Sequence, residues 1–223
     1  MKREILLVVT SALFALTVSA QTSNLPVKEW ISSSQSPFVL YISGDGGFNN
    51  FSTDLCTAIN KAGYSITAIS AKSYFWNKKT PEQTAADITT YLQKQFQNKK
   101  NQQLVLAGYS FGSDVMPFLV NKLPDIIKKK LLAVVMLSPS ASTDFEIHIL
   151  EMFGGNKKRS MNVVAEMNKM GPVKTATIFG SNETAFPVKD IKLLNYRNEN
   201  LPGSHHFDGN TDEVAKTMIK YFK

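Results

Sequence analysis

The 223-residue chain has a single cysteine, Cys56, and only three histidines. One cysteine cannot form an intramolecular disulfide, and its place among apolar residues of a predicted helix indicates a small core side chain. Histidine, cysteine and acidic residues are not grouped with the spacing of metal ligands, so neither a metal nor another cofactor is expected. Basic and aromatic residues are not interleaved as in nucleic-acid-binding proteins, so a nucleic-acid partner is not expected either.

Charged residues are absent from the apolar run at 5–18, which follows a basic start at Lys2 and Arg3. The run ends in a small-residue cleavage site, Val18-Ser-Ala20. It is short for a membrane span and carries a processing signal instead. We therefore expect a signal peptide over residues 1–20, cleavage after Ala20, and a periplasmic or secreted mature protein.

The chain has no internal repeat and no low-complexity block, and about two hundred mature residues suit one domain. Residues 21–37 are polar with two prolines, and we expect an N-terminal arm there, ahead of a single domain at 38–223. The net charge of +7 becomes +6 when residues 1–20, with two bases and one acid, are removed. A basic exported protein is attracted to anionic headgroups, so peripheral contact with an anionic membrane surface is a candidate interaction.

Apolar runs alternate with helical patterns along the chain. Strands are expected at 38–42, 64–70, 103–107, 131–137, 173–179 and 191–194, and helices at 51–62, 81–97, 113–122 and 211–222. This alternation predicts an α/β fold, a mostly parallel sheet with helices on both faces. Continuous apolar runs fit strands that are buried on both faces. In such sheets ligands bind beyond the carboxyl ends of the strands, and the candidate residues below all follow an expected strand.

The pentapeptide Gly108-Tyr-Ser-Phe-Gly112 has the G-x-S-x-G form of a nucleophile elbow. An apolar strand is expected before it and a helix after it, which is the context this motif needs. Glycines at both ends allow a sharp turn between closely passing chains. Ser110, at the tip of the turn, is therefore a candidate nucleophile. An ordinary strand-to-helix turn is the simpler alternative.

A serine nucleophile needs a base, and histidine titrates nearest neutral pH. The tandem pair His205 and His206 lies after the last expected strand, in the serine, acid, histidine order of this fold. We favour His206 as the base, with His205 as the alternative or as a substrate contact. For the acid, which orients the imidazole and stabilises the imidazolium, we favour Glu183 over Asp144, with Asp190 third.

An oxyanion hole needs two backbone N–H donors. We expect one from Phe111, directly after the nucleophile, and one from the glycine loop 43–47, at Asp45 or alternatively Gly46. Asp45, Gly46 and Gly47 are also candidates for substrate contact. A carboxylate beside an oxyanion hole would disfavour negative charge. We therefore hypothesise that Asp45 faces a cationic group of the substrate, such as the ammonium of an aminoacyl ester.

Together these stretches resemble the VirJ/AcvB family of bacterial virulence proteins, which are exported and belong to the α/β-hydrolase superfamily. The matching residues are Ser43-Gly-Asp-Gly-Gly-Phe48, Tyr74-Phe-Trp76, Thr80-Pro-Glu-Gln83 with Asp87, Gly108-Tyr-Ser-Phe-Gly112 with Asp114 and Pro117, Asp144-Phe-Glu-Ile-His148 and Pro202-Gly-Ser-His-His-Phe-Asp-Gly209. The resemblance implies an α/β-hydrolase fold and a periplasmic serine hydrolase, with Ser110 as nucleophile, His206 as base and Glu183 as acid. It also implies activity on lysyl-phosphatidylglycerol and a link to type IV secretion and virulence.

Two positions depart from the family pattern. Ala185-Phe-Pro187 stands where members often have a cysteine, and Phe48 stands where tryptophan is common. Both differences concern the shape of the acyl or headgroup pocket and not the proposed chemistry. The leading prediction is an exported serine esterase acting on aminoacyl esters of an anionic phospholipid. The alternatives are a non-catalytic periplasmic adaptor or chaperone linked to type IV secretion, and a general carboxylesterase on small esters.

Overall fold

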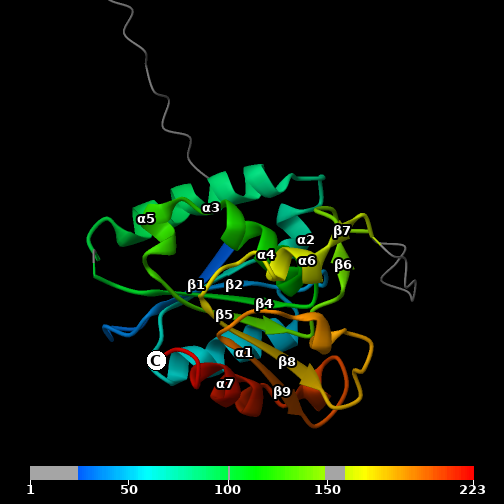
Figure 1. Cartoon of the computed structure of the whole chain (residues 1–223). Helices are drawn as coiled ribbons and strands as arrows, with labels where there is room; N and C mark the ends of the chain where they lie inside the picture. Colours follow the sequence, from blue (N-terminus) through cyan, green and yellow to red (C-terminus); the bar gives the residue numbers. More distant parts are fainter. Residues whose placement is uncertain (1–24, 100, 149–158) are drawn as a thin grey trace, which may run out of the picture.

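A computed structural model describes residues 25–99, 101–148 and 159–223. The expected signal peptide and its cleavage site lie outside these residues. Within them, seven strands form one sheet in the order β1-β3-β2-β4-β5-β8-β9 (Figure 1). The strands are β1 (Val27–Trp30), β2 (Phe38–Ile42), β3 (Ile66–Ile69), β4 (Leu104–Tyr109), β5 (Leu131–Leu137), β8 (Lys174–Gly180) and β9 (Tyr196–Leu201). All neighbours in the sheet are parallel except β1 and β3.

Helices cover both faces of this sheet, as Figure 1 shows. One face carries α1 (Asn50–Lys61) and α7 (Thr211–Ile219), which pack on each other. The other carries α3 (Pro81–Phe96), α4 (Phe111–Lys122) and α6 (Val163–Met167). Shorter elements are α2 (Ala71–Tyr74), α5 (Asp125–Lys128), the two-stranded pair β6 (Ser142–Thr143) and β7 (Met161–Asn162), and the 3-10 turns η2 (Val188–Asp190) and η3 (Phe207–Gly209).

The central strands are buried on both faces, which explains their continuous apolar sequences. In β2, Phe38, Leu40 and Ile42 belong to the core under α3 and α4, whereas Val39 and Tyr41 belong to the core under α1 and α7. The two hydrophobic cores are thus built from alternate residues of the same strands. The predicted α/β architecture with helices on both faces is observed.

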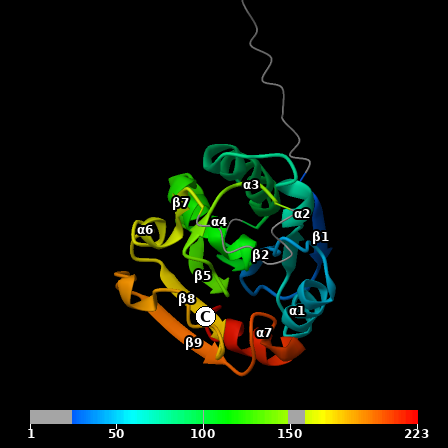
Figure 2. The same cartoon turned by 90° about the vertical axis from the view of Figure 1, so that its right-hand side faces the viewer.

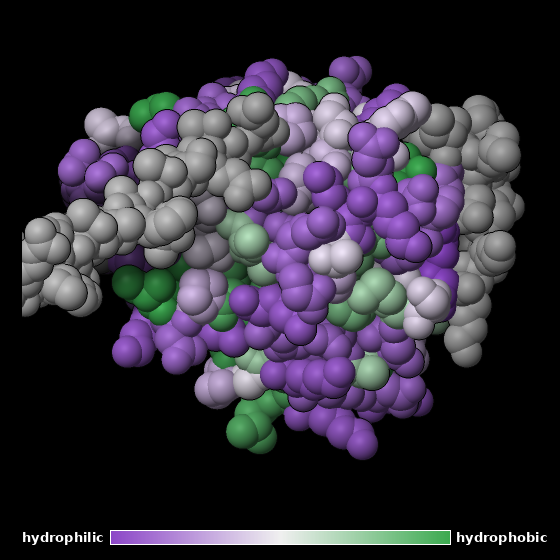
Figure 3. Space-filling view, turned by 90° about the horizontal axis from the view of Figure 1, so that it is seen from above, coloured by the Kyte–Doolittle hydropathy of each residue, from purple (hydrophilic) through white to green (hydrophobic). Residues whose placement is uncertain are grey.

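Helix α3 begins where the sequence indicates. The Thr80 hydroxyl accepts the N–H of Gln83, the Gln83 side chain accepts the N–H of Thr80, and Pro81 occupies the first turn. Its inner side buries Ile88 and Leu92 in the core. Its outer side is polar, and the molecule seen from above is mainly hydrophilic (Figure 3). In the described part of the chain, every helix is too short or too polar to cross a bilayer.

Part of the segment expected to be a polar arm is instead a strand of the sheet. β1 pairs antiparallel with β3 at the sheet edge. The Tyr91 hydroxyl on α3 donates to Glu29 at 2.6 Å, and the Trp30 indole donates to Thr57 on α1 at 3.2 Å. The polar residues that suggested an arm are those that an edge strand exposes or pairs with neighbouring helices.

The last strand also differs from the prediction. Residues 191–194 are not a strand, and Leu194 is 91% exposed. The strand is β9, with the sequence Tyr-Arg-Asn-Glu-Asn-Leu, which pairs with β8 at the other sheet edge. An edge strand is only half covered, so its sequence need not be an apolar run.

Candidate active site

Ser110 stands at the turn between β4 and α4, at the edge of the sheet where the parallel strands end. Figure 2 views the molecule from this side. Ser110 has φ 51° and ψ −120°, a strained conformation for a non-glycine residue. A Cβ on Gly108 would lie 2.5 Å from the carbonyl of Gly112, and a Cβ on Gly112 would lie 2.1 Å from the carbonyl oxygen of Ile42. A side chain at either glycine of the motif would therefore collide with the backbone. The expected strand before the motif and helix after it are both observed.

A hydrogen-bonded relay connects Ser110, His205 and Glu183. The His205 Nε2 atom is 2.9 Å from the Ser110 Oγ atom, and its Nδ1 atom is 2.7 Å from the Glu183 Oε1 atom. In the neutral tautomer that satisfies both contacts, Nδ1–H donates to the carboxylate and Nε2 accepts the serine hydroxyl. Serine, histidine and acid therefore have the arrangement in which the histidine can take the serine proton.

The Glu183 carboxylate is held by three donors. Its Oε2 atom accepts the Ser138 hydroxyl at 2.6 Å and the Gly180 N–H at 2.8 Å, while Oε1 faces His205. Burial alone would raise the pKa of Glu183, but the hydrogen bonds from His205, Ser138 and Gly180 outweigh it and hold the pKa below its ordinary value. Glu183 is therefore a fixed negative charge beside the imidazole at neutral pH.

The sequence-based preference for His206 as the partner of Ser110 is wrong. His206 Nδ1 lies 2.6 Å from the Tyr109 hydroxyl, which also donates to the His205 carbonyl oxygen. The two imidazole rings are turned 76° from each other, and His205 is the one that contacts Ser110 Oγ. Tandem histidines in a tight turn point in different directions, and the sequence does not show which one faces Ser110.

The two competing acids lie against other groups. Asp144 Oδ2 is 2.8 Å from His148 Nε2 and 2.7 Å from Arg159 Nη1. Asp190 is exposed in η2, and its carbonyl oxygen accepts the Asn168 side chain. Of the three carboxylates considered, Glu183 is the one that contacts His205.

The two segments expected to supply the oxyanion donors both adjoin Ser110. Phe111 is the first residue of α4, where backbone N–H groups have no partner within the helix. The loop after β2 is closed by the Gly47 N–H donating to the Gly44 carbonyl, with Asp45 and Gly46 at the centre of the turn. A Cβ on Gly44 would lie 3.4 Å from the Ser110 Cβ, so this loop packs directly on the nucleophile.

A buried carboxyl, Asp114, lies one helical turn after Ser110 on α4. It is 5% exposed, and its Oδ1 atom accepts the Ser140 N–H at 2.6 Å. Burial raises the pKa of Asp114 to about 7, against the opposing effects of Ser140 and His205, and the charge of Asp45 adds to the rise. The surroundings of Ser110 thus combine one firmly ionised carboxylate with one that titrates near neutral pH.

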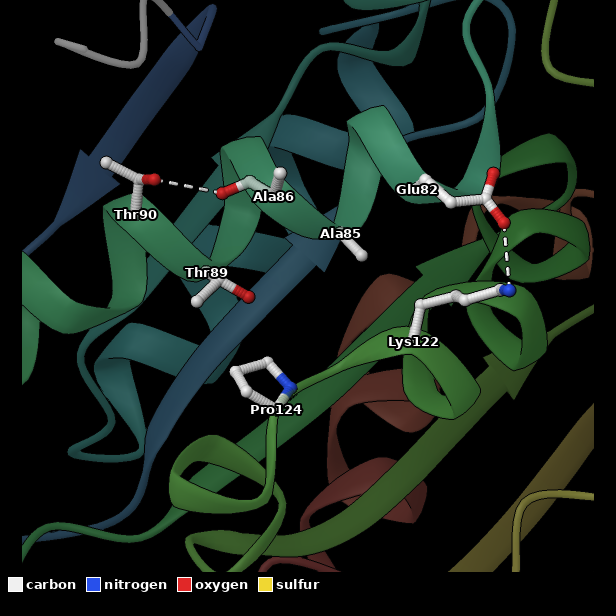
Figure 4. Close-up of a pocket in the computed structure, with 7 residues that line it drawn as sticks. All are labelled: Glu82, Ala85, Ala86, Thr89, Thr90, Lys122 and Pro124. Carbon is white, nitrogen blue, oxygen red and sulfur yellow. Dashed lines mark hydrogen bonds and ion pairs between the residues drawn. The ribbon is translucent and has the colours of Figure 1, made fainter.

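A groove of about 390 Å³ lies elsewhere, and Figure 4 shows its lining. It is bordered by the Glu82–Lys122 ion pair at 2.8 Å and by Thr89 and Pro124. Lys122 ends α4, whose twelve residues rise about 17 Å from the Ser110 end. The groove is therefore separate from the Ser110 site. Among the described residues, acidic, histidine and cysteine side chains form no group of three or more that could hold a metal.

Sequence reasoning missed two residues of the site. Ser138 follows β5 and donates to Glu183, and Tyr109, inside the G-x-S-x-G motif, holds the turn that carries both histidines. Ser138 had a usable signal, because it is a polar residue at the carboxyl end of a central strand. Tyr109 had none, because the variable positions of the motif do not indicate which way a side chain points.

The profile of a family described as "Bacterial virulence protein (VirJ)" matches residues 36–223 of the chain. Comparison of the sequence with curated proteins gave no significant match.

Solved structures with the same fold include an esterase and a lipase-esterase related protein, at low sequence identity. Est1E from Butyrivibrio proteoclasticus, solved with ferulic acid bound, has a TM-score of 0.61 and 14% identity over 91% of this chain and 98% of that one. A lipase-esterase related protein from Clostridium acetobutylicum has a TM-score of 0.60 and 15% identity over 88% and 99%. MenH from S. aureus has a TM-score of 0.62 and 12% identity over 87% and 97%. Likeness at these identities shows the fold, and the predicted α/β-hydrolase fold is confirmed.

The substitution Asp114→Asn should stabilise the protein increasingly as pH rises. The folded state holds the Asp114 proton up to about pH 7, whereas an unfolded aspartate releases it near pH 3.9. Between these values the unfolded state binds fewer protons, so this group makes the wild type less stable as pH rises. An asparagine keeps an acceptor for the Ser140 N–H without titrating.

We expect the free energy of unfolding of Asp114→Asn, relative to wild type, to increase by about 2–3 kcal/mol between about pH 5 and pH 8 in urea titrations. The exposed Asp54→Asn change controls for the loss of a carboxylate. If the difference in unfolding free energy between Asp114→Asn and wild type stays constant across this pH range, Asp114 does not titrate there.

Proposed function

The chain belongs to the VirJ family of bacterial virulence proteins, and from that premise and the geometry around Ser110 we propose that it is an exported serine esterase. One observation carries this proposal, the continuous relay from the Ser110 hydroxyl through His205 to Glu183, with contacts of 2.9 and 2.7 Å. The α/β-hydrolase fold agrees with it, since in this fold the nucleophile, acid and base occur in that chain order.

The reaction proceeds through an acyl-enzyme. Ser110 Oγ attacks the ester carbonyl carbon while His205 Nε2 takes the serine proton, and Glu183 stabilises the imidazolium. The N–H groups of Phe111 and Asp45 donate to the oxygen that becomes negative. The intermediate collapses as the imidazolium protonates the leaving alcohol oxygen. Water, deprotonated by His205, then attacks the acyl carbon, and the imidazolium returns the proton to Ser110 Oγ as the acid is released.

The substrate we propose is an aminoacyl ester of an anionic phospholipid, such as lysyl-phosphatidylglycerol. The half-buried Asp45 lies in the loop that packs on Ser110. Burial is the main cause that raises the pKa values of Tyr109 and Asp114, and the charge of Asp45 adds to both rises, so the negative field of Asp45 reaches both groups. A substrate ammonium group would be attracted by this negative field, whereas an anionic acyl group would be repelled.

Peripheral contact with an anionic membrane is supported by the rim formed by residues 71–80. This segment has three lysines and no acidic residue, and Trp76 is 52% exposed. The rim adjoins the site, because Lys72 packs on Gly47 of the glycine loop and the Phe75 ring lies 5.1 Å from that of Phe111. Tryptophan and lysine together suit an interface of anionic headgroups.

The roles of the two histidines can be separated with a fluorophosphonate probe. The wild type should be labelled on Ser110, and Ser110→Ala should not be labelled. Because His205 is the base, His205→Ala should reduce the second-order labelling rate by about 100-fold or more. His206→Ala, which loses the contact with Tyr109, should stay within about tenfold of wild type.

Intact-mass spectrometry gives the labelling rates. The reverse ranking of the two histidine variants would assign the base to His206. A wild type that is never labelled would contradict the esterase and favour the non-catalytic adaptor.

Asp45→Asn tests the charge of the substrate. We expect kcat/KM for an aminoacyl ester with a free ammonium to fall by about 10- to 100-fold, because a hydrogen-bonded ion pair is lost. For the N-acetylated form of the same ester, kcat/KM should change less than about twofold. Hydrolysis of paired esters, followed by alcohol release, measures both. Equal losses on the two esters would mean that Asp45 does not recognise the cation.

The rim should bind anionic lipid independently of catalysis. In sedimentation with phosphatidylglycerol vesicles, the Ser110→Ala protein should bind as wild type does, and combined Lys72→Gln and Trp76→Ser changes should weaken binding about tenfold. The matched control is Lys128→Gln with Ile126→Ser, an exposed cation and an exposed apolar residue on α5, which follows the end of α4 that is far from Ser110. Equal weakening by the two double variants, or equal binding to phosphatidylcholine, would show that the rim does not dock on anionic lipid.

A further inference from the structure

Ser138 adopts the left-handed backbone conformation although it is not a glycine. Its φ is 46°, and it is 2% exposed directly after β5. The described residues include three other non-glycine positions with positive φ, namely Ser110, Phe207 and Asp208. These three are the nucleophile and the turn that follows the two histidines. Two of the four positions, Ser110 and Ser138, thus carry side chains that belong to the relay or contact it, and unfavourable conformations are commonly kept at functional sites.

The hydroxyl of Ser138 completes the environment of the acid. It donates to Glu183 Oε2 at 2.6 Å, and the Ser138 N–H donates to the Ile178 carbonyl of β8 at 2.8 Å. Ser138 thereby joins the carboxyl ends of β5 and β8. Without this hydroxyl, Oε2 would keep only the Gly180 N–H, and the carboxylate would be freer to turn away from His205.

The turn that contains Ser138 is anchored a second time from the helix that follows the nucleophile. The Ser140 N–H donates to Asp114 Oδ1 at 2.6 Å, and Asp114 lies in the first turns of α4, close in sequence to Ser110. The contacts therefore form a ring from Ser110 through His205 and Glu183 to Ser138, and back through Ser140 and Asp114. Such a ring fixes the acid relative to the nucleophile from both directions.

We propose that Ser138 is a positioning residue, kept in a strained conformation so that its hydroxyl orients Glu183 and, through Glu183, the His205 ring. This inference rests on the proposed esterase chemistry. A glycine would suit the backbone conformation better. The serine is explained by what its hydroxyl does for the acid, because the conformation itself does not favour it.

Two substitutions separate the hydroxyl from the strain. Ser138→Ala removes the hydroxyl and keeps the strained conformation, whereas Ser138→Gly removes both. We expect Ser138→Gly to unfold at a temperature about 2–4 °C above that of Ser138→Ala. Both should be labelled by the fluorophosphonate about 10- to 100-fold more slowly than wild type, because a displaced acid misplaces the base.

The pH dependence of labelling distinguishes positioning from a loss of stability. Glu183 is faced by His205, Ser138 and the Gly180 N–H, and a carboxylate that turns away from His205 stabilises the imidazolium less. The base is then protonated less readily, so the acid limb of the labelling rate should move to lower pH in both variants. The control is Ser113→Ala, which removes a neighbouring buried hydroxyl bonded to the Leu137 carbonyl at 2.8 Å. It should lower the unfolding temperature and leave the labelling rate within about threefold of wild type.

Three results decide the matter. Slow labelling of Ser138→Gly without a matching loss of thermal stability, together with the shifted acid limb, supports the positioning role. Labelling of Ser138→Gly at the wild-type rate, or with an unshifted pH profile, overturns it while leaving the esterase intact. A wild type that does not react at Ser110 overturns the proposed function itself, and the positioning role with it.

Discussion

The close contact between Gly112 and the end of β2 is the constraint on which the site depends. A side chain at position 112 would collide with the Ile42 carbonyl, so α4 can begin directly over the sheet only because Gly112 has none. This approach puts Ser110 in its strained turn at φ 51°. It also brings the loop that continues from β2, with Gly44 and Asp45, against the nucleophile. One backbone contact thus sets the position of the serine and of both segments proposed to bind the oxyanion.

Charge is distributed unevenly in this protein. The chain carries a net charge of +7, yet the groups around Ser110 include the carboxyls of Asp45, Asp114 and Glu183. Three hydrogen bonds keep Glu183 ionised beside His205, whereas burial holds Asp114 closer to neutrality. Basic residues lie outside, including those of the rim at 71–80. A cationic acyl group carried by an anionic lipid would meet favourable charge at both places, and for this reason we propose that substrate class rather than a neutral ester.

The fold and the nucleophile turn could be predicted from sequence because their signals are local. The apolar runs of the buried strands and the spacing of Gly108 and Gly112 each reflect one backbone requirement. The choice between His205 and His206 could not be predicted, since it depends on how a turn anchored by Tyr109 orients two adjacent side chains. Strand β9 was missed because an edge strand needs no apolar run. The position of Ser138 at the end of a central strand was a usable signal, but its contact with Glu183 could not be predicted because the two residues are distant in sequence.

A crystal structure of the protein after reaction with a fluorophosphonate tests the central claim most directly, because it locates the reacting atoms rather than their effects. We predict phosphorus bonded to Ser110 Oγ, its phosphoryl oxygen within hydrogen-bond distance of the N–H groups of Phe111 and Asp45, and His205 still paired with Glu183. Phosphorus on another residue, or a phosphoryl oxygen directed away from both N–H groups, would contradict the proposed site.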